Sequence, residues 1–504
     1  MRRLALALAL LTLAGPACDW EHAALMNSIP IKGKPSVNPT VHVYLGLDGL
    51  SHRAVTKARA RGAFAGWDVA RFIPMFPATS DASWTRILHT GRFAGYEYGH
   101  YDPRHDKLYN TSVEGVLVHA IPPLDSLAHL LPETVRAPVY YEAFDHHATD
   151  YISSVWSYER PVFGWYRALD HLFVALAGRS EKQHTFSAYM LEGDVIGHIR
   201  SEEDFVDVLV TLSERIQDFK RRHPERSFVF TLFGDHGMDS VRKPPQYVVD
   251  FRDQMRAVGI TPVDTLERAD KVAGPAAVAV LHTRVTYVAL HTRPARVAEV
   301  ARLASTAPAA DLVIARGSSP GSGYPEDLEW VDAWREGALA ARFGYQRSTD
   351  TYWLPADVDW AALDLPVAFT PGAESGVFTD ETLFAASAER TYPDFFFRAR
   401  TALEPISVEF PAEAVVSLRD PYMSVGFLVP IVGGLDLASA ASHGAMSGQG
   451  SVSALLTEER SLPATVRSDT LLELFPALSE HLLQRGLTLL PGADGASLDY
   501  AGLP

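Results

Sequence analysis

The sequence predicts an α/β fold with a mostly parallel sheet that is covered by helices on both faces. Three short, nearly continuous apolar runs, at residues 41–47, 186–191 and 228–233, are typical of strands buried on both faces. Between the last two runs, apolar residues recur at three- and four-residue spacing and predict a helix with one apolar face: Phe205, Val208, Leu209, Leu212, Ile216 and Phe219. The order of strand, helix and strand is typical of a parallel sheet.

Composition sets the limits of this prediction. The chain has 504 residues and 47% hydrophobic content, which is enough for a large core and, by length alone, for about three domains. The formal charge of -16 and the pI of about 5.6 argue against a generic basic surface, so we expect no specific nucleic-acid binding. An anionic substrate is still compatible with this charge, because bound metals reverse the local potential.

The N-terminus resembles a secretory signal. Arg2 and Arg3 precede an apolar run at residues 4–14, which is too short to span a bilayer comfortably. Small residues follow at Gly15 and Ala17. We therefore predict a signal peptide at 1–17 and an exported protein, periplasmic or at the cell surface.

Cys18, the first residue after the predicted cleavage, is the only cysteine in the chain. A single cysteine excludes disulfides within the chain and zinc–thiolate sites. Its position resembles the lipid-attachment site of bacterial lipoproteins, although Gly15 stands where Leu is usual. The two interpretations are membrane attachment through a lipidated Cys18 and a plain exported protein whose thiol has no role.

The rest of the chain divides into segments of different composition. We predict a tether at 18–39, a first part of the core at 40–245, an inserted cap subdomain at 246–435 and the completion of the core at 436–504.

Inside the predicted cap, residues 286–291 and 311–315 favour strands and 294–304 a helix. Residues 330–435 are rich in aromatics and prolines and give no clear order of elements. Residues 469–475 favour a short helix that packs back on the core.

Polar side chains follow each of the three core strands. Asp48 follows the first strand, Asp194 and His198 follow the second, and Asp235 and His236 follow the third between two glycines. In open α/β sheets this edge is where ligands bind. Asp194 and His198 are four residues apart, so one helical turn would bring them to the same face. Taken singly, such residues are often turn or cap residues; the Asp235–His236 pair is the hardest to explain by packing.

A hydroxyl group precedes another predicted helix, at residues 82–88. Ser80 at this position is either a helix N-cap or a nucleophile beside free N–H groups that suit a phosphate. Ser80 is the preferred nucleophile and Thr79 the alternative. His443 lies in a Ser-His-Gly turn, which is weak evidence by itself. The other motifs make it a candidate ligand.

Together these residues offer three carboxylates, three imidazoles and one hydroxyl. This inventory suits two divalent metal ions with a nucleophile between them. Zinc is the metal we expect first, with manganese or calcium as alternatives.

The order of these motifs resembles the alkaline phosphatase superfamily, especially its type I phosphodiesterase/nucleotide pyrophosphatase branch. The resemblance covers residues 41–110, 186–240 and 440–478, including Tyr98-Gly99-His100 and the segment 107–110. It implies a doubly wound α/β sandwich, alkaline phosphatase-like, with an inserted cap.

The resemblance also implies roles for the residues. One metal would be held by Asp194, His198 and His443, and the other by Asp48, Asp235 and His236, with Ser80 bound to the second as nucleophile. The reaction would be attack on phosphorus, a covalent phospho-enzyme and its hydrolysis by metal-activated water.

The chain departs from the branch around the nucleophile. The branch has Thr three residues after a Pro; Ser80 is three after Pro77, but counting back from Thr90-Gly91 reaches Asp81. The branch's phosphate-binding Asn, three residues past the nucleophile, corresponds to Ser83. Arg86 is either a second phosphate contact or a solvated helix residue.

The predicted function is an exported two-metal hydrolase of phosphate diesters or monoesters that forms a covalent phospho-Ser/Thr intermediate. Its substrate would be a nucleotide, a lipid head group or a teichoic-type polymer. The alternatives are a phosphonate hydrolase, a phosphomutase or a non-catalytic surface binding protein. A sulfatase is disfavoured because no C/S-x-P-x-R stretch surrounds Ser80. The sequence carries no indication of the oligomeric state.

Overall fold

The computed structural model describes residues 40–97, 99–109, 139–148, 160–180, 183–321, 323–355, 358, 360–366, 376–406, 408–426 and 439–489. The predicted signal peptide, the tether and Cys18 lie outside these residues, as do Tyr98, Asn110 and residues 427–435. Among the described residues, no helix is long and apolar enough to cross a membrane.

The first sheet carries the three predicted core strands at its centre. Within the described residues it has seven strands, in the order β20 (Thr465–Arg467), β2 (Asp68–Ile73), β19 (Ser453–Thr457), β7 (Ser227–Phe233), β1 (Thr40–Leu47), β6 (Thr185–Met190) and β5 (His146–His147). β7, β1, β6 and β5 are mutually parallel, as are β2 and β20, whereas β19 runs antiparallel to both of its neighbours. The predicted mostly parallel sheet is confirmed.

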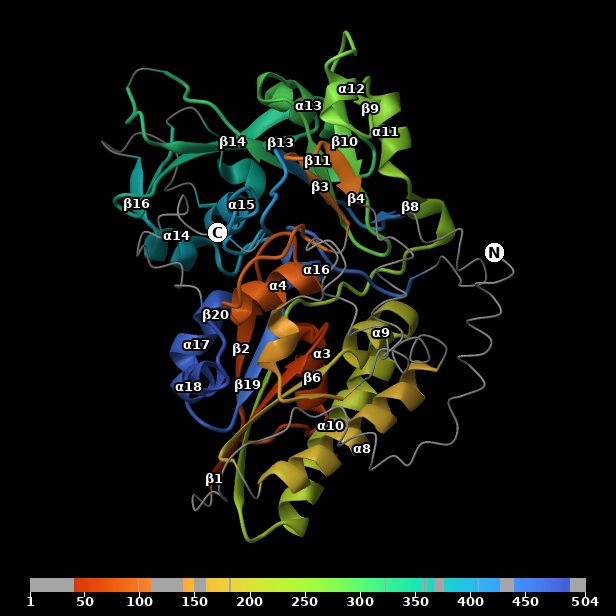
Figure 1. The fold of residues 1–504 in the computed structure, drawn as a ribbon, viewed down its shortest axis with the longest axis vertical. Helices are drawn as coiled ribbons and strands as arrows, with labels where there is room; N and C mark the ends of the chain where they lie inside the picture. The colour runs from red at the N-terminus through yellow and green to blue at the C-terminus, as the bar shows by residue number, and fades with distance from the viewer. Residues whose placement is uncertain are drawn as a thin grey trace.

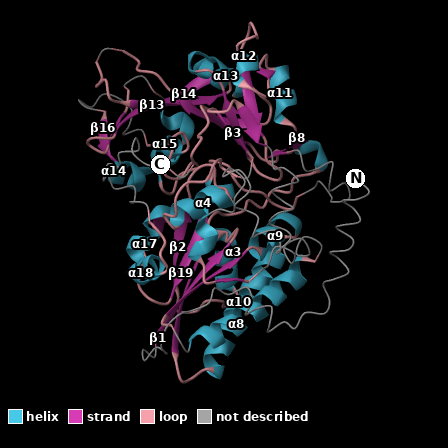
Figure 2. Cartoon of the chain, in the orientation of Figure 1, coloured by secondary structure: helices cyan, strands magenta, loops and turns pink. Residues whose placement is uncertain are grey.

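Helices cover both faces of this sheet, as Figures 1 and 2 show. Alternate residues of a strand point to opposite faces. Val43 and Leu45 of β1 pack in a core with α3 (His52–Ala60), α8 (Pro161–Ser180) and α10 (Glu202–Arg222). Tyr44 packs on the other side with α4 (Ser80–Ile87), α17 (Leu471–Leu474) and α18 (Pro476–Gln484). The doubly wound arrangement is therefore present.

The predicted amphipathic helix is α10. All six of its predicted apolar residues are buried. Ser201 and Asp204 form a capping box at its N-terminus, in which each side chain accepts a hydrogen bond from the other residue's backbone N–H. Tertiary burial and local capping agree, which explains why the periodicity identified this helix.

A second sheet lies within residues 246–435. In the described part of the chain it has nine strands, in the order β16 (Val377–Thr379), β15 (Thr351–Trp353), β14 (Ala338–Gln346), β13 (Glu329–Arg335), β12 (Ala310–Arg316), β17 (Ala414–Leu418), β11 (Tyr287–His291), β10 (Ala276–Val280) and β9 (Thr261–Pro262). All of its pairings are antiparallel except β9 with β10. The strands predicted at 286–291 and 311–315 are β11 and β12.

Helices also flank the second sheet. One core contains α11 (Phe251–Ala257) and α13 (Val297–Ala304), which corresponds to the helix predicted at 294–304. The other core is rich in aromatic side chains and contains α15 (Phe395–Thr401), next to α14 (Asp380–Ser387), with α12 (Leu266–Ala269) also contributing. The boundaries of the inserted cap remain a prediction.

Short elements lie around the junction between the two sheets (Figure 1). They are β3 (His100–Asp102), β4 (Lys107–Tyr109), β8 (Val248–Val249), β18 (Met423–Ser424), α9 (Glu192–Ile199) and α16 (Gly448–Ser451). Single bridges connect Phe93 with Val408 and Val285 with His443. The predicted site residues lie at this junction.

Candidate active site

Three adjacent parallel strands end at the same edge of the first sheet. β1 lies between β6 and β7, and Asp48 follows it directly, with its N–H donating to the Met190 carbonyl at 3.0 Å. Asp235 follows β7, and its Oδ1 accepts from the Gly49 N–H at 3.1 Å. Neighbouring strand ends thus bring residues 48 and 235 together, as the strand-end argument predicts.

Glycine is required where these loops meet. Gly49 has φ +70°, a left-handed conformation that suits glycine, and a Cβ there would lie 2.9 Å from the Asp194 Cα. A Cβ on Gly193 would lie 2.3 Å from the Asp48 carbonyl oxygen. The two loops can therefore approach this closely only because both residues lack side chains.

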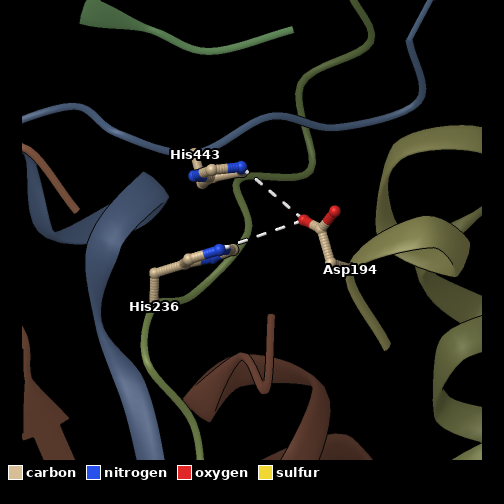
Figure 3. A group of neighbouring side chains, drawn as sticks. All are labelled: Asp194, His236 and His443. Carbon is tan, nitrogen blue, oxygen red and sulfur yellow. Dashed lines mark ion pairs between the residues drawn. The ribbon is translucent and has the colours of Figure 1, made fainter. Parts of the chain in front are cut away.

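Asp194 and His198 share one turn of α9, as their spacing predicts. The Asp194 Oδ1 and the His198 Nε2 are 3.2 Å apart, and both side chains are buried. The Asp194 Oδ1 also lies 3.6 Å from the His443 Nε2 and 3.9 Å from the His236 Nε2 (Figure 3). Residues separated by about 250 positions therefore meet around one carboxylate oxygen.

His443 is held in this place by the loop after Asp235 and His236. Asp239 donates its N–H to the Ser442 carbonyl at 3.0 Å and accepts from the Ser442 N–H at 3.1 Å. Lys243 and Ser439 exchange backbone hydrogen bonds of 2.7 and 3.1 Å. The His443 ring then stacks on the His236 ring, with centroids 3.7 Å apart and planes 8° apart.

All six predicted ligands are buried and adjacent, and we call them the ligand cluster: Asp48, Asp194, His198, Asp235, His236 and His443. Two sets within it have donor atoms within 4.8 Å of one another, Asp48 with Asp235 and His236, and Asp194 with His236 and His443. The set of Asp48, Asp235 and His236 is the one predicted to hold the metal bound to Ser80. The set of Asp194, His236 and His443 differs from the predicted set of Asp194, His198 and His443. His236 takes the place of His198, which lies 3.2 Å from Asp194.

The three histidines share one hydrogen-bond pattern. Each Nδ1 donates to a backbone carbonyl: His198 to Ala441 at 3.1 Å, His236 to Gly237 at 3.0 Å and His443 to Ala78 at 2.9 Å. A carbonyl can only accept, so the Nδ1 atoms carry protons. This fixes the rings and leaves the Nε2 atoms for the cluster, an arrangement typical of metal-ligating histidines.

The charge balance of the cluster favours a cation. The Asp194 Oδ1 and the Asp235 Oδ2 are buried and have no hydrogen-bond donor among the described residues. Burial raises the pKa of Asp235 well above its usual range, and the charge of Asp48 adds to this. Burial alone would lower the pKa of His236, but Asp235, Asp48 and Asp194 outweigh it and raise this pKa to about 10. A proton on His236 thus compensates part of the negative charge of the carboxylates, and a divalent ion would compensate more of it. The residues therefore fit a metal.

Of the two predicted nucleophiles, Ser80 is the one whose hydroxyl reaches the cluster. It is the first residue of α4 and only partly buried, and its Oγ lies 3.2 Å from the Asp48 Oδ1 and 3.3 Å from the His236 Nε2. Thr79 is fully buried and its Oγ1 donates to the Tyr96 carbonyl at 2.7 Å. The geometry favours Ser80 over Thr79 as nucleophile.

The other residues near the predicted nucleophile differ in their surroundings. Asp81, reached by counting back from Thr90, accepts from the Tyr140 hydroxyl at 3.1 Å. Ser83 is fully buried on α4, and its Oγ has no hydrogen-bond partner in the described part of the chain. Its role in substrate binding stays a prediction.

Arg86 is not brought to the ligand cluster. Its Nη2 donates to the Asp469 Oδ2 at 2.7 Å, and both side chains are buried. The alternative of a solvated helix residue is wrong, because the ion pair with Asp469 lies inside the protein. The geometry gives no support to the predicted phosphate contact.

Glu97 is a site residue that the sequence reasoning missed. Its Oε1 accepts from the Ser80 N–H at 3.2 Å, and burial together with the charge of Asp81 raises its pKa well above the usual range. No strand end or periodic pattern marks this position. Only the fold shows that the Glu97 carboxyl group lies at the start of α4.

The family model for type I phosphodiesterase/nucleotide pyrophosphatase matches residues 56–365, more than half of the chain. Among solved structures, the chain is similar to murine ectonucleotide pyrophosphatase/phosphodiesterase 5, with 12% identity and a TM-score of 0.43 over 90% of this chain and 96% of that chain. The comparison with curated proteins gave no match. The predicted resemblance is confirmed, and the chain belongs to the type I phosphodiesterase/nucleotide pyrophosphatase family, a family of phosphoric ester hydrolases.

Proposed function

We propose that the protein is a two-metal hydrolase of phosphate esters that acts through a covalent phosphoserine at Ser80. The observation that carries the proposal is the position of the Ser80 Oγ, about 3 Å from two members of a buried carboxylate–imidazole cluster. The two ligand sets described above support two ions. Nitrogen and oxygen donors without thiolates suit zinc, with manganese as an alternative.

The residues divide the work of the reaction. Bound metals would supply Lewis acidity and lower the pKa of oxygen nucleophiles. The ligand cluster would hold them, with Asp48 and Asp235 on one side and Asp194, His198 and His443 on the other. Asp48 also orients Ser80, since its Oδ1 accepts the hydroxyl proton in a 3.2 Å hydrogen bond.

The covalent step follows from this orientation. The Ser80 hydroxyl gives up its proton to solvent, its Oγ forms a bond to phosphorus as the bond between phosphorus and the ester oxygen breaks, and the departing oxygen takes a proton from solvent. Water then attacks the phosphoserine, which restores the Ser80 hydroxyl and releases the phosphate product. The first-turn N–H groups of α4 suit the negative charge on the phosphoryl oxygens.

The substrate class and location remain part of the proposal. We infer an exported enzyme that acts on a phosphate-ester small molecule or a lipid head group, without specific nucleic-acid binding. The basic start and short apolar run at the N-terminus support export, and the single Cys18 supports a lipid anchor.

A side-by-side assay tests the function. The purified protein should contain about two zinc ions per chain and hydrolyse p-nitrophenyl phosphate or bis-p-nitrophenyl phosphate. The ratio of kcat/KM for the two esters assigns the preference for monoester or diester. Zinc-loaded protein with no activity on either ester would contradict the proposal, and fewer than one zinc per chain would favour a binding protein that only keeps the fold.

A further inference from the structure

Tyr189 contacts Asp48, a member of the ligand cluster, from β6 of the first sheet. It lies in β6, where it pairs with Gly46 of β1, and its hydroxyl donates to the Asp48 Oδ2 at 2.5 Å. Tyr189 is 4% exposed and Asp48 is fully buried, so water does not compete for this hydrogen bond. A buried tyrosine hydroxyl usually has such a partner, but this partner is a predicted metal ligand.

Packing fixes the tyrosine ring independently of its hydroxyl. The ring meets Trp84 edge-on at 5.5 Å and 87°, and lies 5.4 Å from Phe144 and 5.8 Å from Tyr141. Loss of the single oxygen atom would leave these ring contacts in place.

The hydrogen bond makes the two oxygens of Asp48 different. Because Tyr189 occupies Oδ2, the other oxygen, Oδ1, faces the Ser80 Oγ and the His236 Nε2, each at 3.2 Å. Asp194 and Asp235 each keep one buried oxygen without a donor among the described residues. Asp48 is therefore the cluster carboxylate whose orientation is set by a side-chain hydroxyl.

We propose that Tyr189 is a positioning residue that acts through Asp48, holding Oδ2 so that Oδ1 is presented to a metal and to Ser80. The metal-binding part of this inference stands on the ligand cluster alone. Its kinetic part rests on the proposed function. Hydrogen bonds to ligating groups typically change metal affinity by 10- to 100-fold.

Tyr189→Phe tests the inference, with Tyr44→Phe as the matched control. Tyr44 is also fully buried in the first sheet and also donates to a carboxylate, but its partner is Glu459, at 3.3 Å. Titration of zinc against a chromophoric chelator should show that Y189F weakens one of the two zinc sites by about 10- to 100-fold. In esterase assays at saturating zinc, kcat should fall about tenfold or more while KM changes less than about twofold. Y44F should match the wild type in both.

A double variant tests whether Tyr189 acts through Asp48. In an Asp48→Asn background, Y189F should add no further loss of zinc affinity. Wild-type zinc affinity and kcat in Y189F would overturn the inference, as would an equal loss in Y44F. If the wild type binds zinc but hydrolyses no ester, the proposed function fails and the zinc titration still decides the role of Tyr189.

If Y189F does not fold, the wild-type protein provides the test. With tyrosines labelled with ¹³C at Cζ, zinc should shift one buried tyrosine resonance, and D48N should abolish that shift. The absence of any tyrosine resonance that depends on both zinc and Asp48 would overturn the inference.

Discussion

The two sheets of this molecule meet the ligand cluster in different ways. In the first sheet β6, β1 and β7 are parallel and end together, and five of the six cluster residues follow these strands. The second sheet is almost wholly antiparallel, so neighbouring strands end at opposite edges. In the described part of the chain, Thr286, directly before β11 of this sheet, donates its N–H to the His443 carbonyl at 2.7 Å.

This difference explains where the chemistry lies. Parallel pairing brings several strand ends to one place, so short loops can combine their side chains into one site. Antiparallel pairing divides strand ends between two edges and suits a packing surface better. We therefore expect changes at the first sheet's edge to affect catalysis and metal content, and changes in the second sheet to affect stability.

Ser80→Ala gives the largest expected effect. Loss of the Oγ that lies 3.2 Å from Asp48 should reduce kcat by at least about 1,000-fold while zinc content stays at the wild-type value. Thr79→Ala should retain much of the activity, because the Thr79 hydroxyl donates to the Tyr96 carbonyl inside the protein. Steady-state kinetics and metal analysis of both variants check this. The opposite result would move the nucleophile to Thr79.

His236→Ala should have the next largest effect, because His236 belongs to both ligand sets. We expect zinc content to fall below one ion per chain and kcat to fall at least about 100-fold. His198→Ala provides the contrast, since His198 belongs to neither set and lies 3.2 Å from Asp194, and this variant should retain one tightly bound ion. Equal zinc loss in the two variants would show that the cluster binds its ions as a single unit.

The sequence predicted the features that have local causes. Continuous apolar runs identified β1, β6 and β7, because both faces of these strands are buried. Five of the six ligands could be found because they follow such strands, whereas His443 was identified only together with the other motifs. The order of the strands could not be found, since β19, which separates β7 from β2, comes from residues more than 200 positions later.

Residues that act through long-range contacts left little signal. Glu97 approaches Ser80 only because the loop after α4 folds back, and Arg86 pairs with Asp469, 383 positions away. Tyr189 offered one indication: a tyrosine in a fully buried strand needs a partner for its hydroxyl. That rule predicts the existence of a partner, but not that it is Asp48.

The smallest expected effect lies in the second sheet's region and concerns stability rather than catalysis. His282 follows β10, is 7% exposed, and stacks on Tyr287 with ring centroids 5.5 Å apart. Burial, with a smaller contribution from His100, lowers the pKa of His282 to about 3. The unfolded chain, with an ordinary histidine pKa of about 6.5, therefore binds a proton between about pH 6.5 and 3 that the folded protein does not bind.

The direction of the resulting pH dependence of stability follows from this difference in proton binding. Stability from neutral His282 is fully present above pH 6.5 and is lost as the pH falls toward 3. Between pH 7 and pH 5, this group should lower the free energy of unfolding of the metal-free protein by about 2 kcal/mol. In the His282→Gln variant this position cannot titrate. Between pH 7 and pH 5, denaturant unfolding of this variant should therefore show a fall in the free energy of unfolding that is about 2 kcal/mol smaller than that of the wild type. The same change at exposed His184 should leave the wild-type loss unaltered. An identical pH dependence in H282Q and wild type would mean that His282 does not contribute to acid stability, and the proposed division of roles between the two sheets would fail.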